Sequence, residues 1–363
     1  MLDNWGVPTW DETATVLQPP FLGGLLQLSC VLQSRQMTTL QHLFAGQPLG
    51  RVLQSNDAVR ISQLPDNTSI SSRRRFETWF EHKLERYRNT IDDILVTINN
   101  PTHLSRTEKT ALLSRVEDTN MVIYQCRKPR AVHHDSILQL AEQVGLRRLD
   151  ANLCANTAGL TELRVQPTAL HQRYLPYSQR PMNWHTDGYY QSPTRRIRGM
   201  LLHCIDDADG GDSLLIDHEI VFGLLYQQNP SWIYALAHPE AMTVPANHDA
   251  DGNCREEQTG PVYRLDSGQL HMRYTTRKKN ILWRNDLLTL EAVRALKNIL
   301  ETKASLLVRH HLQPGEGILS NNVLHRREAF ENSTSNRNRF LYRGRFLDPM
   351  TRSTSGLADA LAK

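Results

Sequence analysis

The sequence contains few cysteines, and no two of them lie close together. The chain of 363 residues has five, an odd number, and no CxxC pair occurs. This spacing excludes a zinc ribbon and a thioredoxin-like redox site. Free, buried thiols in a reducing compartment are the simplest interpretation. The five residues are Cys30, Cys126, Cys154, Cys204 and Cys254.

Long hydrophobic runs are also missing. The main early apolar stretch, FLGGLLQLSCVL, is interrupted by two glycines, a glutamine and a serine, and is too short to span a membrane. The N-terminal MLDNWGVPTWDETATV has no basic start followed by an apolar core, so it does not resemble a signal peptide. We therefore expect a soluble, cytoplasmic protein with no membrane partner.

A strong excess of one charge is absent as well. Lys plus Arg number 42 and Asp plus Glu number 38, which gives a net charge of +4. The densest basic run, Ser72–Arg75, opens an amphipathic stretch and is best explained as a solvated helix start. Because no surface run interleaves basic and aromatic residues, we expect no nucleic-acid partner.

The N-terminal third of the chain has helical periodicity in places. Residues 75–98 carry apolar side chains at helical spacing, which predicts a helix. Ser105 and Glu108 form a capping-box pattern that opens a second helix through Val116. Residues 1–105 are predicted to be a mostly helical or irregular region of unknown role.

Short strands and turns dominate the rest of the chain, with a few helices between them. MVIYQC and GMLLHCID are predicted strands, and Asp217 is a predicted helix cap. Neither an internal repeat nor a low-complexity segment is present. We predict a mainly β structure with α-helices, in which residues 106–363 form a double-stranded β-helix (jelly roll) core supported by helices.

The segment NWHTDGYY places a histidine two residues before an aspartate. In a strand, residues i and i+2 point to the same face, about 7 Å apart. An imidazole nitrogen and a carboxylate oxygen on one face are two of the ligands of a 2-His-1-carboxylate iron site. His185 and Asp187 are therefore candidate catalytic metal ligands, and a plain surface pair is the alternative.

The third ligand has to come from elsewhere in the fold. His325 is the best candidate, because the surrounding QPGEGILSNNVLHRREAF is typical of a hairpin inside a barrel. Strands far apart in sequence are commonly neighbours in a jelly roll.

These segments together resemble a known family. HTD, then LLHCIDDADGGDSLLID, then PGEGILSNNVLHRREAF and RFLYR are similar to the Fe(II)/2-oxoglutarate-dependent oxygenases, closest to the taurine dioxygenase and γ-butyrobetaine hydroxylase branch. PVYRLDSGQLHMRYTT and RFLYRGR also resemble the glutarate 2-hydroxylases. The resemblance runs from Ile123 to Phe346, and the cysteine-rich N-terminal module of the eukaryotic γ-butyrobetaine enzymes is absent.

The resemblance implies roles for particular residues. His185, Asp187 and His325 would hold Fe(II), with 2-oxoglutarate and O2 as cosubstrates. Ser213 and Arg339 would hold 2-oxoglutarate, and Arg337 competes with Arg339 for this role. A guanidinium suits the task because its planar fork matches a carboxylate with two parallel hydrogen bonds.

Substrate residues are predicted from the same strand and from two nearby segments. Arg343 and Arg345 share a strand face with Arg339, so one arginine could hold the cosubstrate and the next a substrate anion. Tyr189 continues the odd-numbered face of NWHTDGYY, and Arg273 is a further pocket candidate, with packing as the alternative for both.

The predicted function is hydroxylation of a C–H bond in a small polar, anionic or zwitterionic metabolite, with release of succinate and CO2. The alternatives are desaturation, cyclisation or C–N cleavage by the same chemistry, or a metal-binding jelly roll without activity. An aspartate at position 187 is unlike the related halogenases, which carry a small residue there. Members of this branch often form dimers or tetramers, so a homo-oligomer is a further expectation.

Overall fold

A computed structural model describes residues 70–128, 132–150, 159–165, 175–248, 254–277, 281–332, 338–350 and 357. All of them lie in one compact unit, Asp57–Lys363. No helix in this described part is both long and apolar enough to cross a membrane. Cys126 and Cys204 are buried free thiols, as predicted, whereas Cys30, Cys154 and Arg337 lie outside the described residues.

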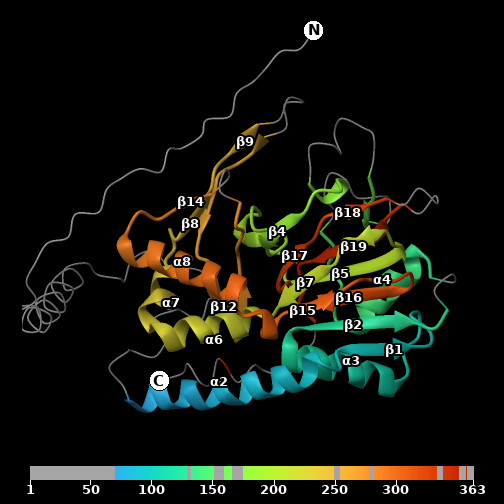
Figure 1. Cartoon of the computed structure of the whole chain (residues 1–363), viewed down its shortest axis with the longest axis horizontal. Helices are drawn as coiled ribbons and strands as arrows, with labels where there is room; N and C mark the ends of the chain where they lie inside the picture. The colour runs from blue at the N-terminus through green and yellow to red at the C-terminus, as the bar shows by residue number, and fades with distance from the viewer. Residues whose placement is uncertain are drawn as a thin grey trace, which may run out of the picture. The chain divides into compact units, whose positions relative to one another are not determined.

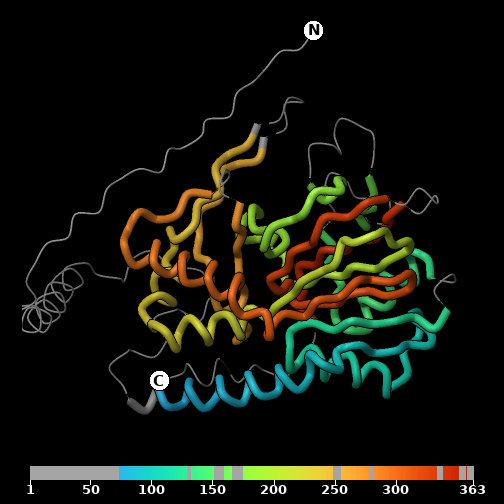
Figure 2. Tube along the Cα trace, in the orientation of Figure 1, coloured from blue at the N-terminus to red at the C-terminus, as the bar shows by residue number. Residues whose placement is uncertain are grey.

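Six strands form the larger sheet, in the order β1-β2-β16-β5-β19-β3. β1 and β2 run parallel, and the other neighbours run antiparallel. Segments far apart in the sequence lie side by side here, as the trace of β2, β16 and β5 shows (Figure 2). The bounds are β1 Leu95–Ile98, β2 Met121–Cys126, β3 Thr161–Leu163, β5 Gly199–Asp206, β16 Glu316–Ser320 and β19 Phe340–Phe346.

Four antiparallel strands form a second sheet, in the order β15-β7-β17-β4. Their bounds are β4 Met182–His185, β7 Ser213–Ile216, β15 Val308–His310 and β17 Leu324–Arg327. One continuous hydrophobic core includes side chains from both sheets, such as Ile123, Leu215 and Leu341.

A second core lies between the larger sheet and two helices. α3 (Arg106–Thr119) and α4 (His134–Gln143) contribute Leu112 and Ile137 to it, and β2 contributes Tyr124. The predicted capping box is confirmed, because Ser105 accepts from the Glu108 N–H and the Glu108 side chain accepts from the Ser105 N–H.

The segment after β7 builds a separate group of helices and short strands, on the left of Figure 1. Asp217 caps α6, as predicted, by accepting a hydrogen bond from the Glu219 N–H at 2.8 Å. The helices are α6 His218–Gln228, α7 Pro230–Leu236 and α8 Leu287–Thr302, followed by the 3-10 turn η6 Ala304–Leu306. The strands are β8 Met242–Val244, β9 Asn247–His248, β10 Cys254–Arg255, β11 Gln258–Gly260, β12 Tyr263–Asp266, β13 Gln269–Met272 and β14 Leu282–Trp283. Two further short strands, β6 Asp209–Gly210 and β18 Phe330–Glu331, pair near the second sheet.

The first described helix is shorter at its C-terminal end than predicted. α2 spans Ile70–Ile91, and residues 95–98 form β1 instead of continuing the helix. LVTI is rich in β-branched residues, and its pairing with β2 outweighs the helical spacing of its apolar side chains. Helical periodicity alone could not locate this change of structure.

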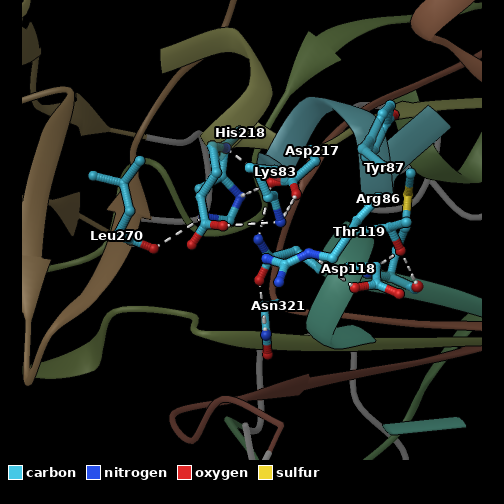
Figure 3. A network of polar contacts seen from close by, with 12 residues as sticks. Lys83, Arg86, Tyr87, Asp118, Thr119, Asp217, His218, Leu270 and Asn321 are labelled. Atoms are coloured by element: carbon cyan, nitrogen blue, oxygen red, sulfur yellow. Dashed lines mark hydrogen bonds and ion pairs between the residues drawn. The ribbon is translucent and has the colours of Figure 1, made fainter. Parts of the chain in front are cut away.

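α2 is attached to the rest of the unit by a buried polar network (Figure 3). Lys83 Nζ lies 2.8 Å from Asp217 Oδ2 and 2.9 Å from Glu219 Oε2, and all three side chains are at most 1% exposed. Tyr87 donates a hydrogen bond to the Leu306 carbonyl at 2.7 Å. The helices also approach closely, because the Phe80 ring occupies the space where a Cβ on Gly223 of α6 would lie.

The described residues thus form a mixed α/β structure, mostly of sheets, with six α-helices. α2 and β1, which fall before the predicted boundary at residue 105, belong to the same compact unit as the two sheets. The boundary itself stays a prediction.

Candidate metal and cosubstrate site

β4 and β17 bring two histidines together. His185 is the last residue of β4, and His325 is its register partner in β17. Their ring centroids are 4.3 Å apart. With Asp187 they offer three ligand atoms that all lie within 4.8 Å of one another. No other group of this kind occurs in the part of the chain that the structure describes.

Asp187 approaches the histidines by a route different from the predicted one. β4 ends at His185, and Asp187 begins a turn. Gly188 allows this turn with a φ of 69°, which glycine adopts without steric cost. The prediction that both side chains share a strand face was therefore wrong. Asp187 Oδ1 nonetheless lies 3.7 Å from His185 Nε2.

Asn322 holds the backbone of Asp187 on both sides. Its Oδ1 accepts from the Asp187 N–H at 2.8 Å, and its Nδ2 donates to the Asp187 carbonyl at 2.9 Å. The same Nδ2 donates to the Ile197 carbonyl at 2.7 Å. Sequence reasoning gave this residue no role, although two adjacent amides before the candidate histidine were a visible signal.

The protonation of the three side chains suits metal binding. The Nδ1 of His185 lies 2.8 Å from the Asn183 carbonyl, and that of His325 lies 2.9 Å from the Val323 carbonyl. A ring nitrogen facing a carbonyl carries the proton, so each Nε2 presents a lone pair. Burial lowers the pKa of His185 to about 3 and also lowers the pKa of His325.

Asp187 is held as a carboxylate. Burial alone would raise its pKa, but the positive charge of Arg343 is the largest opposing influence and helps to hold the pKa of Asp187 well below its usual range. Its Oδ2 lies 3.4 Å from Arg343 Nη1 and accepts no hydrogen bond from a described residue. Neutral imidazoles and an ionised carboxylate are the forms that bind a divalent metal.

Arg339 is a buried guanidinium without a carboxylate partner in the described part of the chain. Its residue is 7% exposed, and its guanidinium lies 5.1 Å from the centre of the Phe330 ring. Burial lowers the pKa of Arg339, which means that its charge is poorly solvated. A buried charge without a partner costs free energy, so binding an anion at this guanidinium would be favourable.

Arg327 adds a second positive charge close to Arg339. Its guanidinium lies 4.8 Å from the same Phe330 ring, and burial together with the Arg339 charge lowers the pKa of Arg327. It donates to the carbonyls of Ser178 and Arg180 but forms no ion pair with a described residue. Ser213 is the register partner of Arg327, which brings the predicted serine to the same pair of strands.

The two further arginines of β19 have different surroundings. Arg343 faces Asp187, and its Nε has no hydrogen-bond partner among the described residues. Arg345 has two close partners, because its Nη2 lies 2.6 Å from Asp150 Oδ2 and its Nη1 donates to the Tyr190 hydroxyl at 2.8 Å. Arg343 therefore has fewer polar partners than Arg345 among the described residues.

Arg273 and Tyr189 form part of a backbone support. The Arg273 guanidinium donates to the Tyr189 carbonyl at 2.6 Å, to the Met242 carbonyl at 3.0 Å and to the Gln258 carbonyl at 2.6 Å. With these three contacts in a 9% exposed residue, Arg273 is poorly placed to bind an anion. Tyr189 is equally buried, and its ring packs edge-on against Tyr190.

Comparison with known proteins identifies the family. The model of the taurine catabolism dioxygenase TauD, TfdA family matches residues 133–344, more than half of the chain. The chain belongs to this family. It is a dioxygenase, and its cofactors are Fe(II) and 2-oxoglutarate. A comparison with curated proteins finds no match.

Several solved structures are similar to this chain at low sequence identity. AAD-2 in complex with Mn(II) and N-oxalylglycine is 13% identical with a TM-score of 0.52, over 72% of this chain and 96% of that chain. The iron oxygenase OrfP with α-ketoglutaric acid is 14% identical with a TM-score of 0.49, over 75% and 91%. An asparagine oxygenase with Fe(II), 3-hydroxyasparagine and succinate is 14% identical with a TM-score of 0.47, over 75% and 91%.

Proposed function

We propose that this dioxygenase hydroxylates a C–H bond of a small polar, anionic or zwitterionic metabolite and releases succinate and CO2. The observation that carries the proposal is the convergence of His185, Asp187 and His325 within 4.8 Å, with Arg343 facing the carboxylate. We also propose that the two sheets are the halves of a double-stranded β-helix that encloses this site.

In this proposal the two Nε2 atoms and Asp187 Oδ1 hold Fe(II). Two features support the fit: each histidine has its other nitrogen on a backbone carbonyl, and Asp187 is ionised. Bound iron supplies the oxidising chemistry that uses O2 and 2-oxoglutarate to attack the C–H bond. The protein positions these groups and keeps water away.

Arg339 binds the distal carboxylate of 2-oxoglutarate, and Ser213 donates a hydrogen bond to it. The buried guanidinium supports this assignment: it has no carboxylate partner among the described residues, and a bidentate carboxylate would supply that counter-charge. The positive charge of Arg327 strengthens the attraction for a dianion. Arg327 is held in place by two backbone carbonyls, so Arg339 is the one that contacts the ligand.

Arg343 binds an anionic group of the substrate. Asp187 can contact the metal and Arg343 at the same time, because its Oδ1 lies near His185 and its Oδ2 lies near Arg343. The substrate anion would then lie beside the metal, with its C–H bond next to the iron. Tyr189 lines the pocket in this proposal, and Arg273 supports the backbone of Tyr189 from outside.

Anaerobic addition of Fe(II) and then 2-oxoglutarate tests the proposal. We expect a weak visible charge-transfer band from the chelate, which disappears in His185→Ala. His134→Ala is the matched control, since this exposed histidine pairs with Asp135. Iron binding without a band, or a band that survives in His185→Ala, would contradict the site. Succinate release on a panel of amino and carboxylic acids, with product mass, then identifies the substrate and separates hydroxylation from desaturation.

A further inference from the structure

The second sheet has a groove on the face opposite the candidate metal site. This groove has a volume of about 890 Å³ and lies between the sheet, the C-terminal half of α8 and the residues after it. Pockets of roughly 300–1,000 Å³ accommodate small organic ligands. Its lining includes Trp184, Leu214 and Arg326 from the sheet, and Lys297, Leu300 and Leu307 from the other wall.

The floor of the groove is the row of residues next to the metal histidines. Arg309, Leu214 and Arg326 are register partners across β15, β7 and β17. The next row of register partners in the same sheet, displaced by one residue, contains His325 and its partner His185. Successive side chains of a strand point to opposite faces. Arg326 and Trp184 therefore face the groove while the histidines beside them face the metal site.

The groove carries an excess of positive charge. Four of its lining side chains are basic and one is acidic, Glu301. Arg309 is neutralised by Asp212 at 2.8 Å and Glu328 at 2.7 Å, and Lys297 lies 3.5 Å from Glu301. The other two basic side chains of the lining are Arg277 and Arg326.

Arg326 and Arg277 lack close carboxylates among the described residues. The nearest acidic atom to Arg326 is Glu328 Oε1 at 4.0 Å, and the Arg326 Nε is buried with no hydrogen-bond partner. The Arg326 guanidinium lies 5.5 Å from the centre of the Trp184 ring, within range of a cation–π contact. No ion pair of Arg277 with a described residue is found, and its side chain is exposed. An anion between these two groups would gain charge-assisted hydrogen bonds.

We propose that this groove is a second ligand site, which binds a small organic anion, a carboxylate or phosphate with an apolar part. The two guanidiniums contact the anionic group, and Leu214, Leu300 and Leu307 contact the apolar part. The site is separate from the cosubstrate pocket, because Leu214 and Arg326, which line the groove, alternate along β7 and β17 with Ser213 and His325, which belong to the candidate metal and cosubstrate site.

Calorimetric titration of the full chain, loaded with Fe(II) and excess 2-oxoglutarate without oxygen, tests the proposal. The excess 2-oxoglutarate keeps the probes out of the cosubstrate pocket. Phenyl phosphate and benzoate are the probes, and inorganic phosphate reports the anionic group alone. We expect phenyl phosphate or benzoate to bind at least tenfold more tightly than inorganic phosphate, and the tighter probe identifies the anionic group.

Variants connect this binding to the groove. Arg277→Ala and Arg326→Ala should each weaken the tighter probe at least tenfold, whereas Arg326→Lys should retain part of the affinity. Arg294→Ala is the matched control, because this exposed arginine lies on α8 but does not line the groove. Arg277 is exposed, so its removal is not expected to disturb folding. The absence of binding, or undiminished binding to Arg277→Ala and Arg326→Ala, would overturn the proposal.

Discussion

Lys83 and Arg339 are both buried cations, but their surroundings differ. Lys83 is 1% exposed and lies within 2.9 Å of two carboxylates, Asp217 and Glu219. Arg339 is 7% exposed, has no carboxylate partner among the described residues, and has the cation Arg327 near it. A buried cation is tolerated when it is paired, and an unpaired one costs free energy.

The difference separates structural from functional charge. The pairs of Lys83 attach α2 to the first turn of α6, so its charge is satisfied within the fold. The charge of Arg339 has no counter-charge among the described residues, and in the proposed function an anion supplies it. Perturbed, buried ionisable groups of this second kind are concentrated at functional sites.

Lys83→Met should destabilise the protein most. The variant leaves two buried carboxylates without their cation, and breaking a buried pair in this way costs about 3–5 kcal/mol. Urea unfolding of the protein without ligands measures the loss. The iron site should keep its affinity in the fraction that remains folded. A loss below about 1 kcal/mol, the range of exposed pairs, would contradict the distinction.

Arg343 and Arg345 of β19 allow a structural charge and a functional charge to be compared within one strand. Arg345→Met removes one of two arginine partners of the buried Asp150, the other being Arg195, and should cost up to about 3 kcal/mol of unfolding free energy. Arg343→Met should cost less unfolding free energy than Arg345→Met, since its one carboxylate contact among the described residues is at 3.4 Å. Arg343→Met should instead raise the substrate KM. An unchanged KM would reject its role in binding substrate.

Arg339→Met should act on ligand binding and not on stability. Loss of a bidentate, charge-assisted contact should weaken 2-oxoglutarate at least about 100-fold, which corresponds to about 2.7 kcal/mol. The unfolding free energy without ligand should stay the same or rise, because an unpaired buried charge is replaced by an apolar side chain. Unfolding and the succinate-release KM measure the two effects. A destabilisation as large as that of Lys83→Met would show that Arg339 has a structural partner.

Asn322→Ala should have a smaller effect that is confined to the metal site. It removes three hydrogen bonds that hold the backbone around Asp187. Groups that orient a metal ligand typically contribute about 10- to 100-fold in metal affinity, and we expect about tenfold here. Competition with a chelator measures the affinity. Asn321→Ala is the control, because Asn321 bonds to Asn120 and Met350 instead; an equal loss in both would indicate a general disturbance.

Arg73→Ala should have the smallest effect. Arg73 and Glu77 form an exposed i,i+4 pair at 2.9 Å on α2, the helix that carries Lys83. Such pairs contribute about 0.3–0.5 kcal/mol. A loss near that of Lys83→Met in the same urea experiment would mean that α2 itself, and not the buried charge, determines the result.

The sequence predicted the chemistry of the site better than its geometry. His185, Asp187 and His325 were identifiable because iron needs those residue types and the surrounding motifs occur in order. The turn at Gly188 was not predictable, since the spacing of His185 and Asp187 suits a strand equally well. Arg273 was chosen for its charge, whereas its three carbonyl partners come from segments distant in sequence.

The helices and strands show the same contrast between features that local sequence patterns predict and features that depend on distant contacts. The capping box of α3 and the Asp217 cap are local patterns, and both are confirmed. β1 depends on pairing with β2, so periodicity assigned it to a helix. Lys83 lies between Phe80 and Tyr87 on the buried face of α2, and a lysine at such a position is a signal for a buried partner. That signal was present in the sequence, but Asp217 and Glu219 could be named only from the fold.

The most direct test of the central claim is the stabilisation of the protein by 2-oxoglutarate, measured by urea unfolding with Fe(II) and without oxygen. At a ligand concentration of 100 times Kd, the native protein should gain about 2.7 kcal/mol. Lys83→Met should show the same gain, starting from a lower unfolding free energy without ligand. Arg339→Met, whose Kd is expected to be about 100-fold higher, should gain about 0.4 kcal/mol or less at that concentration. An undiminished gain in Arg339→Met would contradict the assignment of this buried arginine as the cosubstrate anchor.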